Sequence, residues 1–187
     1  MIIILSAPSG CGKTSIANKL IESDSNLVLS VSATTRKPRE TEIEGKHYFF
    51  TTREKFKQMQ FLEYAEIYGN LYGTPSKYIE AKLREGKDIL FDIDSKGAYQ
   101  IMEKSLAGVV SIFILPPNME TLESRLRARG LDNQNAIETR MKSAKYEIAN
   151  AGNYHYTVKN DNLDKAVQEI QAIILNERNK RSNENSK

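Results

Sequence analysis

The sequence predicts an α/β fold in which helices flank a mainly parallel β-sheet. Three apolar runs lead to this prediction: MIIIL at 1–5, ILFDID at 89–94 and VVSIFIL at 109–115. Runs with little polar interruption are typical of strands covered on both faces, as parallel strands usually are. Segments with helical spacing of apolar residues separate the runs, and this alternation of strand and helix indicates parallel pairing.

The first strand, Met1 to Leu5, runs into a glycine-rich turn and then into a helix. Ile16, Ala17 and Leu20 recur at helical spacing and place that helix over 13–22. Pro116 follows the third apolar run and ends it, because proline supplies no backbone donor. Further helices are expected at 76–85, 95–104, 119–129, 136–150 and 163–177.

The pattern changes between residues 33 and 75. Short aromatic-rich segments, HYFFTT, FLEYAEI and NLYGTP, alternate there with polar turns, which is typical of an inserted lobe of mixed β structure. We expect the whole chain, 1–187, to form one domain. Residues 178–187 have no apolar anchor and are expected to fray as a flexible, solvated tail.

Composition and charge indicate an ordinary soluble domain. Hydrophobic residues make up 40% and charged residues 27% of the chain, and no apolar run approaches the roughly 20 residues that span a bilayer. The formal net charge of +3, without a basic run interleaved with aromatics, gives no indication of a nucleic-acid partner. A leader is lacking and the one cysteine forms no internal disulfide, so we expect a cytoplasmic protein that contacts no membrane.

The turn after the first strand, SAPSGCGKTS at 6–15, has the composition of a phosphate-binding loop. Glycines in such a loop let several backbone N–H groups point inward, and the helix N-terminus adds positive charge. Lys13 is expected to reach the β- and γ-phosphates of a nucleotide, and Thr14 to bind magnesium. The residues expected to line the phosphates are Ala7, Pro8, Ser9, Gly10, Cys11, Gly12, Lys13 and Thr14.

One position departs from the strict pattern G-x-x-x-x-G-K-[ST], because Ala7 stands where the first glycine belongs. Alanine adds only a methyl group, so the loop accommodates it if the φ angle there is negative. The alternative interpretation is a glycine-rich turn that contains a lysine by chance. The order of strand, loop and helix favours the phosphate-binding loop.

The acids that follow the second apolar run and the cysteine of the loop also have predicted roles. Magnesium needs a carboxylate beside the threonine hydroxyl, and the run at 89–94 ends in Asp92 and Asp94, either of which fits; a strand-end cap is the alternative role. Cys11 lies close to a helix N-terminus, which can lower a thiol pKa, so modest reactivity blocked by nucleotide is one prediction. A role as a small packing residue is the favoured interpretation of Cys11.

Longer motifs follow the loop in a fixed order: SVSATTRKPRETEIEGKHYFF, FLEYAEIYGNLYGTP, ILFDID, RLRARG and KNDNLDKA. Together with the opening loop they resemble the guanylate kinase family, from Ile2 to about Leu175. The resemblance implies an enzyme that transfers a phosphoryl group from ATP to GMP, giving ADP and GDP, with Mg²⁺ as cofactor. It also implies a P-loop NTPase-type fold with a core at 1–32, 76–124 and 146–177, a GMP-binding lobe at 33–75 and a helical lid at 125–145.

The resemblance assigns the phosphate of GMP to four residues. Arg36 and Arg39 match the arginines that hold it, and a guanidinium fork suits a phosphate dianion better than an ammonium group does. Tyr48 and Tyr72 match hydroxyl donors to the same phosphate. Either tyrosine alone would be read as a core aromatic, so their assignment depends on the arginines.

Recognition of the guanine base is implied for another set. Glu63 matches the acid that accepts hydrogen bonds from guanine N1–H and the exocyclic amine, and Ser32 and Thr74 match hydroxyls that complete the site. Asp92 and Asp94 are the acids expected beside the nucleoside. Adenine lacks this pair of donors and would leave a buried Glu63 unpaired, so guanine selectivity is expected to depend mainly on Glu63.

On the ATP side the resemblance implies a lid of arginines. Arg125 and Arg129 match residues that fold over the ATP phosphates, and Arg140 matches a third that bridges phosphates. Asn160 and Asp161 match the loop beside adenine. The cations expected to neutralise the transferring phosphoryl group, and so to be catalytic, are Lys13, Arg36, Arg125, Arg129 and Arg140.

Two other functions compete with this interpretation. Members of the same fold serve as phosphopeptide-binding scaffolds, but these usually have a degraded phosphate loop, whereas Gly12, Lys13 and Thr14 are intact here. A kinase acting on a sugar phosphate would have no use for Ser32, Glu63 and Thr74 together. The expected partners are therefore ATP and GMP, without nucleic acid or membrane, and the chain is expected to be a monomer or homodimer.

Overall fold

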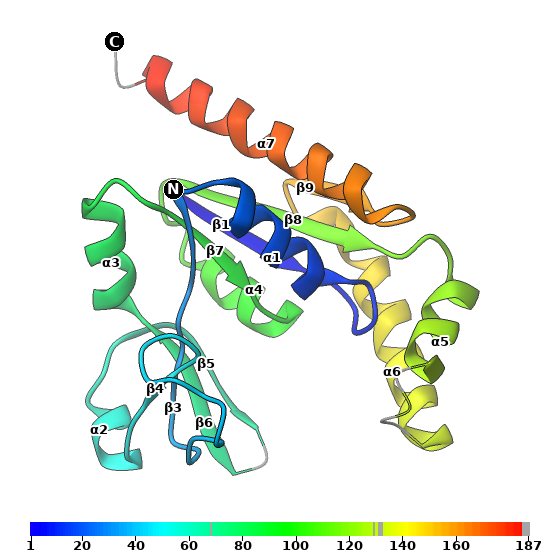
Figure 1. The fold of residues 1–187 in the computed structure, drawn as a ribbon, viewed down its shortest axis with the longest axis horizontal. Helices are drawn as coiled ribbons and strands as arrows, with labels where there is room; N and C mark the ends of the chain where they lie inside the picture. Colours follow the sequence, from blue (N-terminus) through cyan, green and yellow to red (C-terminus); the bar gives the residue numbers. More distant parts are fainter. Residues whose placement is uncertain (68, 129, 131–132, 185–187) are drawn as a thin grey trace.

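The computed structural model describes residues 1–67, 69–128, 130 and 133–184, and it contains two β-sheets (Figure 1). The larger sheet has five parallel strands in the order β2-β7-β1-β8-β9. Its strands are β1 (Ile2–Ser6), β2 (Leu27–Leu29), β7 (Asp88–Asp92), β8 (Val109–Leu115) and β9 (Tyr156–Lys159). The predicted α/β fold with a parallel sheet is confirmed.

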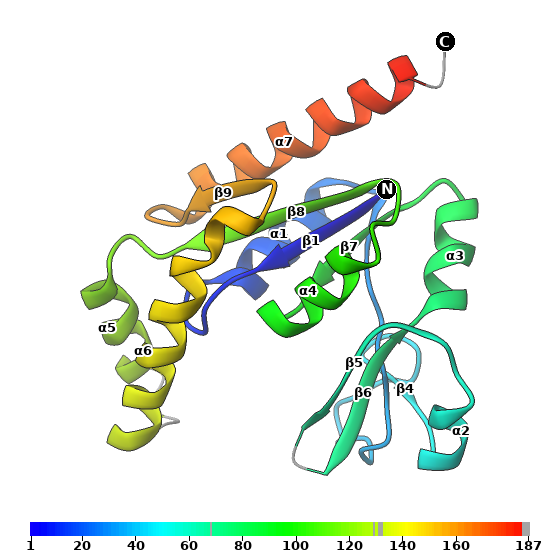
Figure 2. The same cartoon turned by 180° about the vertical axis from the view of Figure 1, so that it is seen from behind.

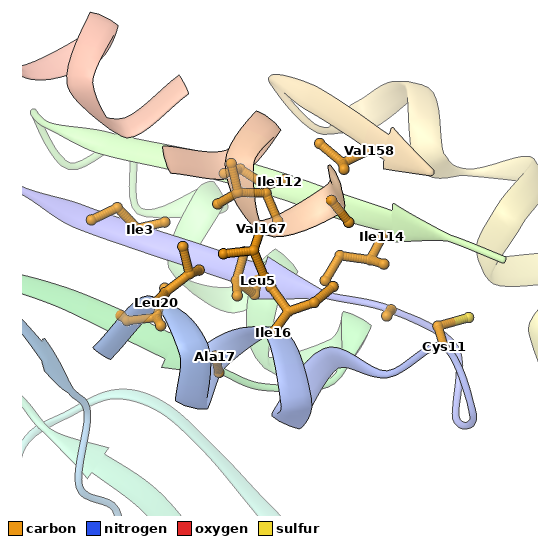
Figure 3. Close-up of a cluster of buried hydrophobic side chains, with 14 of the residues drawn as sticks. Ile3, Leu5, Cys11, Ile16, Ala17, Leu20, Ile112, Ile114, Val158 and Val167 are labelled. Carbon is orange, nitrogen blue, oxygen red and sulfur yellow. The ribbon is translucent and has the colours of Figure 1, made fainter. Parts of the chain in front are cut away.

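Helices cover both faces of this sheet, as the uninterrupted apolar strands require. Successive side chains of a strand point to opposite faces, so Ile3 and Leu5 of β1 enter one buried cluster while Ile2 and Ile4 enter another. The helices on the Ile3 and Leu5 side are α1 (Lys13–Ser23), α5 (Met119–Ala128) and α7 (Leu163–Glu184). Figure 3 shows Ile16 and Leu20 of α1 and Val167 of α7 packed against this face. The helices on the other side are α3 (Ser76–Arg84), α4 (Ser95–Glu103) and the end of α6 (Gln134–Ala149) with its following 3₁₀ turn η1 (Ala151–Asn153).

The second sheet forms the lobe expected between residues 33 and 75. Its strands are β3 (Ala33–Thr34), β4 (Phe49–Phe50), β5 (Phe61–Ile67) and β6 (Asn70–Pro75), in the order β4-β3-β6-β5, and a short helix α2 (Arg53–Lys57) lies between β4 and β5. β3 pairs with β4 in parallel, whereas β6 pairs with β3 and β5 antiparallel. The predicted mixed β structure is therefore confirmed.

The lobe and the α5–α6 pair both project below the parallel sheet, on opposite sides of the view (Figures 1 and 2). The loop between β1 and α1 lies on the side where α5 and α6 project (Figure 2). In open parallel sheets ligands bind beyond the carboxyl ends of the strands. The fold therefore provides three surfaces for a site: the loop after β1, the α5–α6 pair and the lobe.

The predicted flexible tail at 178–187 coincides over most of its length with the end of a helix. α7 continues to Glu184, although the apolar pattern stops near Glu177. Arg178 explains this, because its guanidinium lies 2.7 Å from a carboxylate oxygen of Asp24 and 2.7 Å from one of Asp88. Polar anchoring at 178 thus extends the helix where hydrophobic spacing predicts its end. The final three residues lie outside the described part of the chain.

Candidate active site

The loop after β1 surrounds a cavity of about 190 Å³ lined by residues 7–15. Gly10 and Gly12 have φ angles of 95° and 84°, which are favourable only for glycine. Gly12 also lacks room for a side chain, since a Cβ would lie 2.6 Å from Nδ2 of Asn160. Among the described residues Ser105 is the one non-glycine with a positive φ, so Ala7 has the negative φ that the loop requires.

Lys13 and Thr14, the first residues of α1, both contact Asp92 at the end of β7. Lys13 forms an ion pair with one carboxylate oxygen, and the Thr14 hydroxyl donates to the other over 2.9 Å. β7 is the parallel neighbour of β1, and Leu5 and Asp92 are opposite in register. The pairing of two strands thus brings Asp92 to the loop, from 78 residues further along the chain.

These contacts fit a magnesium site at Thr14 and Asp92. A hydroxyl and a carboxylate oxygen are ligands that Mg²⁺ accepts, and here they are in direct contact. The described residues include no group of three or more His, Cys, Asp or Glu that could hold a metal alone. An ion at this place would take its remaining ligands from phosphate and water, as Mg²⁺ in nucleotide sites usually does.

Two of the predicted lid arginines reach the loop or its support. Arg140 of α6 donates from Nη1 to the Ser9 hydroxyl over 2.9 Å, and Arg125 of α5 donates from Nη2 to the carbonyl of Asn160 over 3.4 Å. A second cavity, of about 390 Å³, adjoins the loop and is lined by Gly12, Arg125 and Asn160 among others. Arg129 lies outside the described residues.

The predicted reactivity of Cys11 is wrong. The side chain is fully buried within the core cluster, beside Ile16 (Figure 3). Burial raises the pKa of the Cys11 thiol to about 12, against which the nearby charge of Arg125 has only a smaller, lowering effect. Desolvation outweighs the helix N-terminus, and the interpretation as a small packing residue is the correct one.

The lobe brings Ser32, Thr74 and Glu63 into one chain of hydrogen bonds. The Thr74 hydroxyl donates to Glu63 over 2.7 Å, and the Ser32 hydroxyl lies 3.2 Å from that of Thr74. Glu63 is only 8% exposed, and burial raises its pKa, with a further increase from the nearby charge of Asp94. A half-satisfied, buried acid of this kind is a candidate for binding a ligand that supplies donors.

A cationic group stands in the same lobe around Arg36. Its Nε donates to the Tyr72 hydroxyl over 3.3 Å, and its guanidinium lies 5.5 Å from the ring centre of Tyr48. Glu42 accepts from Arg36 Nη2 over 2.7 Å and from the backbone N–H of Arg39 over 2.8 Å. The bond from Arg36, followed by that from Arg39, lowers the pKa of Glu42 to about 2. Three of the four predicted phosphate-binding residues therefore meet through their side chains, and Arg39 joins them through its backbone.

A family model described as guanylate kinase matches residues 1–177. The chain belongs to the guanylate kinase family. It is 53% identical over 186 residues to the guanylate kinase of Rickettsia bellii, with 97% of each chain covered, and 48% identical to that of Mesorhizobium japonicum, with 97% of this chain and 85% of the relative covered. A crystal structure of guanylate kinase from Anaplasma phagocytophilum superimposes with a TM-score of 0.71 at 39% identity, covering 95% of this chain and 85% of the other.

Within this guanylate kinase fold, Asp92 and Asp94 contact different parts of the site. Asp92 contacts Lys13 and Thr14, whereas Asp94 caps α4 by accepting from the N–H of Gly97 over 2.9 Å. Asp94 is thus the N-cap of the following helix, a role different from the strand-end cap considered as its alternative. Asp94 also faces the base-side cluster, because Gly97 lies against both its carboxylate and that of Glu63. Its contact with a nucleoside stays a prediction.

Sequence reasoning missed two acids that organise the site. Glu42 forms an ion pair with Arg36, and the run ETE at 40–42, directly after the arginine pair, was the available signal for it. Glu147 of α6 accepts from the Ser95 hydroxyl over 2.7 Å and so ties the lid helix to the start of α4; burial raises its pKa. No pattern in the sequence identifies Glu147. Among the described residues, no helix is long and apolar enough to span a bilayer.

Proposed function

We propose that the chain transfers the γ-phosphoryl group of ATP to GMP, giving ADP and GDP, at a site between the loop after β1 and the lobe. The observation that carries this proposal is the buried Glu63, hydrogen-bonded to Thr74 and backed by Ser32, in a chain that also has an intact phosphate-binding loop. Membership of the guanylate kinase family supports it. A phosphate-binding module or a sugar-phosphate kinase would have no use for a buried acceptor of this kind.

On the ATP side, the loop N–H groups and Lys13 hold the β- and γ-phosphates. Thr14 and Asp92 are the residues that would hold Mg²⁺, and a bound Mg²⁺ would neutralise charge on the phosphoryl oxygens. Arg125 and Arg140, together with Arg129, act on the ATP phosphates from the lid. The hydrogen bonds of Arg140 to Ser9 and of Arg125 to Asn160 support this assignment, since both end at the loop or its neighbour.

On the GMP side, Arg36 and Arg39 with Tyr48 and Tyr72 hold the phosphate. Glu63 accepts from N1–H and the exocyclic amine of guanine. The Thr74 hydroxyl donates to only one Glu63 oxygen, Oε1, in the described contacts, which leaves acceptor capacity for the base.

Ser32 and Thr74 complete the base site, and Asp94 stands beside it. The negative charge of Asp94 raises the pKa of Glu63, so a charged Glu63 is costly there. A ligand that donates hydrogen bonds to the Glu63 carboxylate is therefore favoured.

The chemistry requires alignment and charge neutralisation rather than a general base. The attacking oxygen of GMP is already anionic, and charge in the transition state spreads over the phosphoryl oxygens. Lys13, Arg36, Arg125 and Arg140 supply fixed positive charge for that purpose. We assign the enzyme to purine nucleotide metabolism in the cytoplasm, where it would return GMP to the diphosphate pool.

The test is an ADP-release assay with ATP and Mg²⁺, in which GMP, AMP, UMP and ribose 5-phosphate are offered separately. Turnover with GMP alone is the expected result. Turnover with ribose 5-phosphate would favour the sugar-phosphate kinase. Binding of ATP without turnover on any acceptor would overturn the proposal in favour of a binding module, with Arg36, Arg39, Tyr48 and Tyr72 as its phosphoryl-ligand site.

A further inference from the structure

Helix α4 is attached to the lobe through the side chain of Gln100. Its Oε1 accepts from the backbone N–H of Tyr64 over 3.0 Å, and its Nε2 donates to the backbone carbonyl of Tyr64 over 3.0 Å. α4 itself belongs to the core, where Ala98 and Ile101 are fully buried against the parallel sheet. One side chain of the core thus satisfies both backbone groups of one lobe residue.

The position of Tyr64 explains why an amide is suited to this role. β5 is an edge strand whose single neighbour in the sheet is β6, so one row of its backbone groups points away from the sheet. Such groups ordinarily bond to water or to another strand. A glutamine amide offers one acceptor and two donors, matching a peptide group, and therefore adds one rung of pairing to the edge.

The same strand segment carries Glu63, immediately before Tyr64. The pairing of β5 with β6 is irregular between Phe61 and Tyr64, so the regular ladder does not fix the backbone at Glu63. α4 approaches Glu63 at a second point as well, since a Cβ added to Gly97 would lie 3.3 Å from Glu63 Oε2. Gly97 and Gln100 are three residues apart and so lie on the same face of the helix.

We propose that Gln100 is a positioning residue for guanine specificity: it fixes the backbone at Tyr64 and thereby holds the Glu63 carboxylate against α4, at the edge of the base. The proposal rests on GMP being the acceptor, as proposed above. Gln100 itself touches neither the base nor the phosphates. Its contribution acts through the placement of Glu63, because a buried carboxylate recognises a base only when its oxygens are held at hydrogen-bonding distance.

Lys104 provides the matched control. It lies four residues after Gln100, at the C-cap of α4, and donates from Nζ to the carbonyl of Phe61, on the same strand, over 3.4 Å. It therefore also joins α4 to β5, but two residues before Glu63 and with one bond. Gln100→Met and Lys104→Met replace each side chain by an unbranched apolar one. A general loosening of the lobe would appear in both variants.

The experiment is a double-mutant cycle on KM for GMP and KM for ATP, using wild type, Gln100→Met, Glu63→Gln and the double variant. Gln100→Met is expected to raise KM for GMP about tenfold, while kcat and KM for ATP stay within about twofold. In the Glu63→Gln background the same change is expected to add less than about twofold, because residues that act through one contact are not additive. Lys104→Met should leave KM for GMP within about twofold.

Thermal melting of each variant accompanies the kinetics. Gln100→Glu serves as a second variant if Gln100→Met does not fold, because it keeps the acceptor for Tyr64 N–H and loses the donor; the same cycle is expected to hold. Equal effects of Gln100→Met in both backgrounds, equal effects of Lys104→Met, or an unchanged KM for GMP would each overturn the positioning role. A wild-type protein inactive on GMP would instead overturn the proposed function itself.

Discussion

Asn160→Ala is expected to destabilise the phosphate-binding loop by removing a buried hydrogen bond that supports its backbone. The Asn160 side chain is 4% exposed and donates from Nδ2 to the carbonyl of Cys11 over 2.7 Å, across 149 residues of sequence. Nδ2 also occupies the space beside Gly12, where the loop backbone is in the left-handed region. Removing a buried donor costs about 1–3 kcal/mol, because the acceptor loses its partner and water cannot replace it freely. At about 2–4 °C per kcal/mol for a chain of this size, a cost near 2 kcal/mol lowers Tm by about 4–8 °C.

Thermal unfolding followed by circular dichroism measures the fall in Tm of Asn160→Ala. Steady-state kinetics with ATP measures the effect of the substitution on ATP binding. A loop without its anchor holds the phosphates less well, so KM for ATP is expected to rise about tenfold, equivalent to about 1.4 kcal/mol, while KM for GMP changes by less than about twofold. Glu80→Ala is the control, since Glu80 is exposed on α3 and its ion pair with Arg84 lies within that helix, away from the loop. A Tm for Asn160→Ala within about 1 °C of wild type, with KM for ATP unchanged, would refute the reasoning.

Three further predictions concern the site. Lys13→Ala should lower kcat by about a thousandfold while leaving the fold intact by circular dichroism, because a fixed charge on the transferring phosphoryl is lost; turnover near the wild-type rate would contradict the assignment. Burial raises the pKa of Glu63, and only the carboxylate accepts two donors, so KM for GMP should rise as pH falls, starting above the ordinary pKa of glutamate. Glu63→Gln should remove this pH dependence, and a profile that parallels wild type would exclude Glu63 as its source. Cys11 should resist iodoacetamide at pH 8 both with and without ATP and react only after unfolding, since its thiol is buried with a pKa of about 12; labelling of the native protein would show that the loop opens.

The parts of the fold that could be predicted are those that depend on short stretches of sequence, such as apolar runs and glycine positions. Strands made of uninterrupted apolar runs must be covered by helices on both faces of the sheet. The side chains of Ile2 to Leu5 indeed alternate between two buried clusters. The glycines of the loop predict its conformation because backbone geometry depends on residue type, and Gly10 and Gly12 have the expected positive φ. The short strands β2 and β9 were not predicted, since three or four residues are too few for a period to be recognised.

The unpredicted parts of the site depend on contacts between distant segments. The support of the loop by Asn160 and the bonds of Gln100 to Tyr64 join elements 149 and 36 residues apart. The burial of Cys11 is a property of the closed core, so proximity to a helix terminus gave the wrong direction for its pKa. Arg178 likewise extends α7 through partners near residues 24 and 88. Composition and spacing show which groups are present, but not which of them pair.

Asp92 and Glu42, the two acids that pair with cations of the site, differ in the other contacts that they make. Lys13 is paired with Asp92 and Arg36 with Glu42, and all four side chains are less than 20% exposed. Each acid keeps a partly buried cation compensated before substrate binds, which matters because an uncompensated charge in such a place is costly. Asp92 also contacts Thr14 and is suited to a metal ion. If Lys13 bound a phosphate as proposed, Asp92 would therefore still have a second partner. Glu42 has no such alternative among the described contacts, but it also accepts from the backbone of Arg39, and this bond would still hold it if Arg36 bound phosphate as proposed. With substrate bound as proposed, Lys13 and Arg36 would both leave their acids for phosphate: Asp92 would keep its contact with Thr14, and Glu42 would keep its contact with the backbone of Arg39.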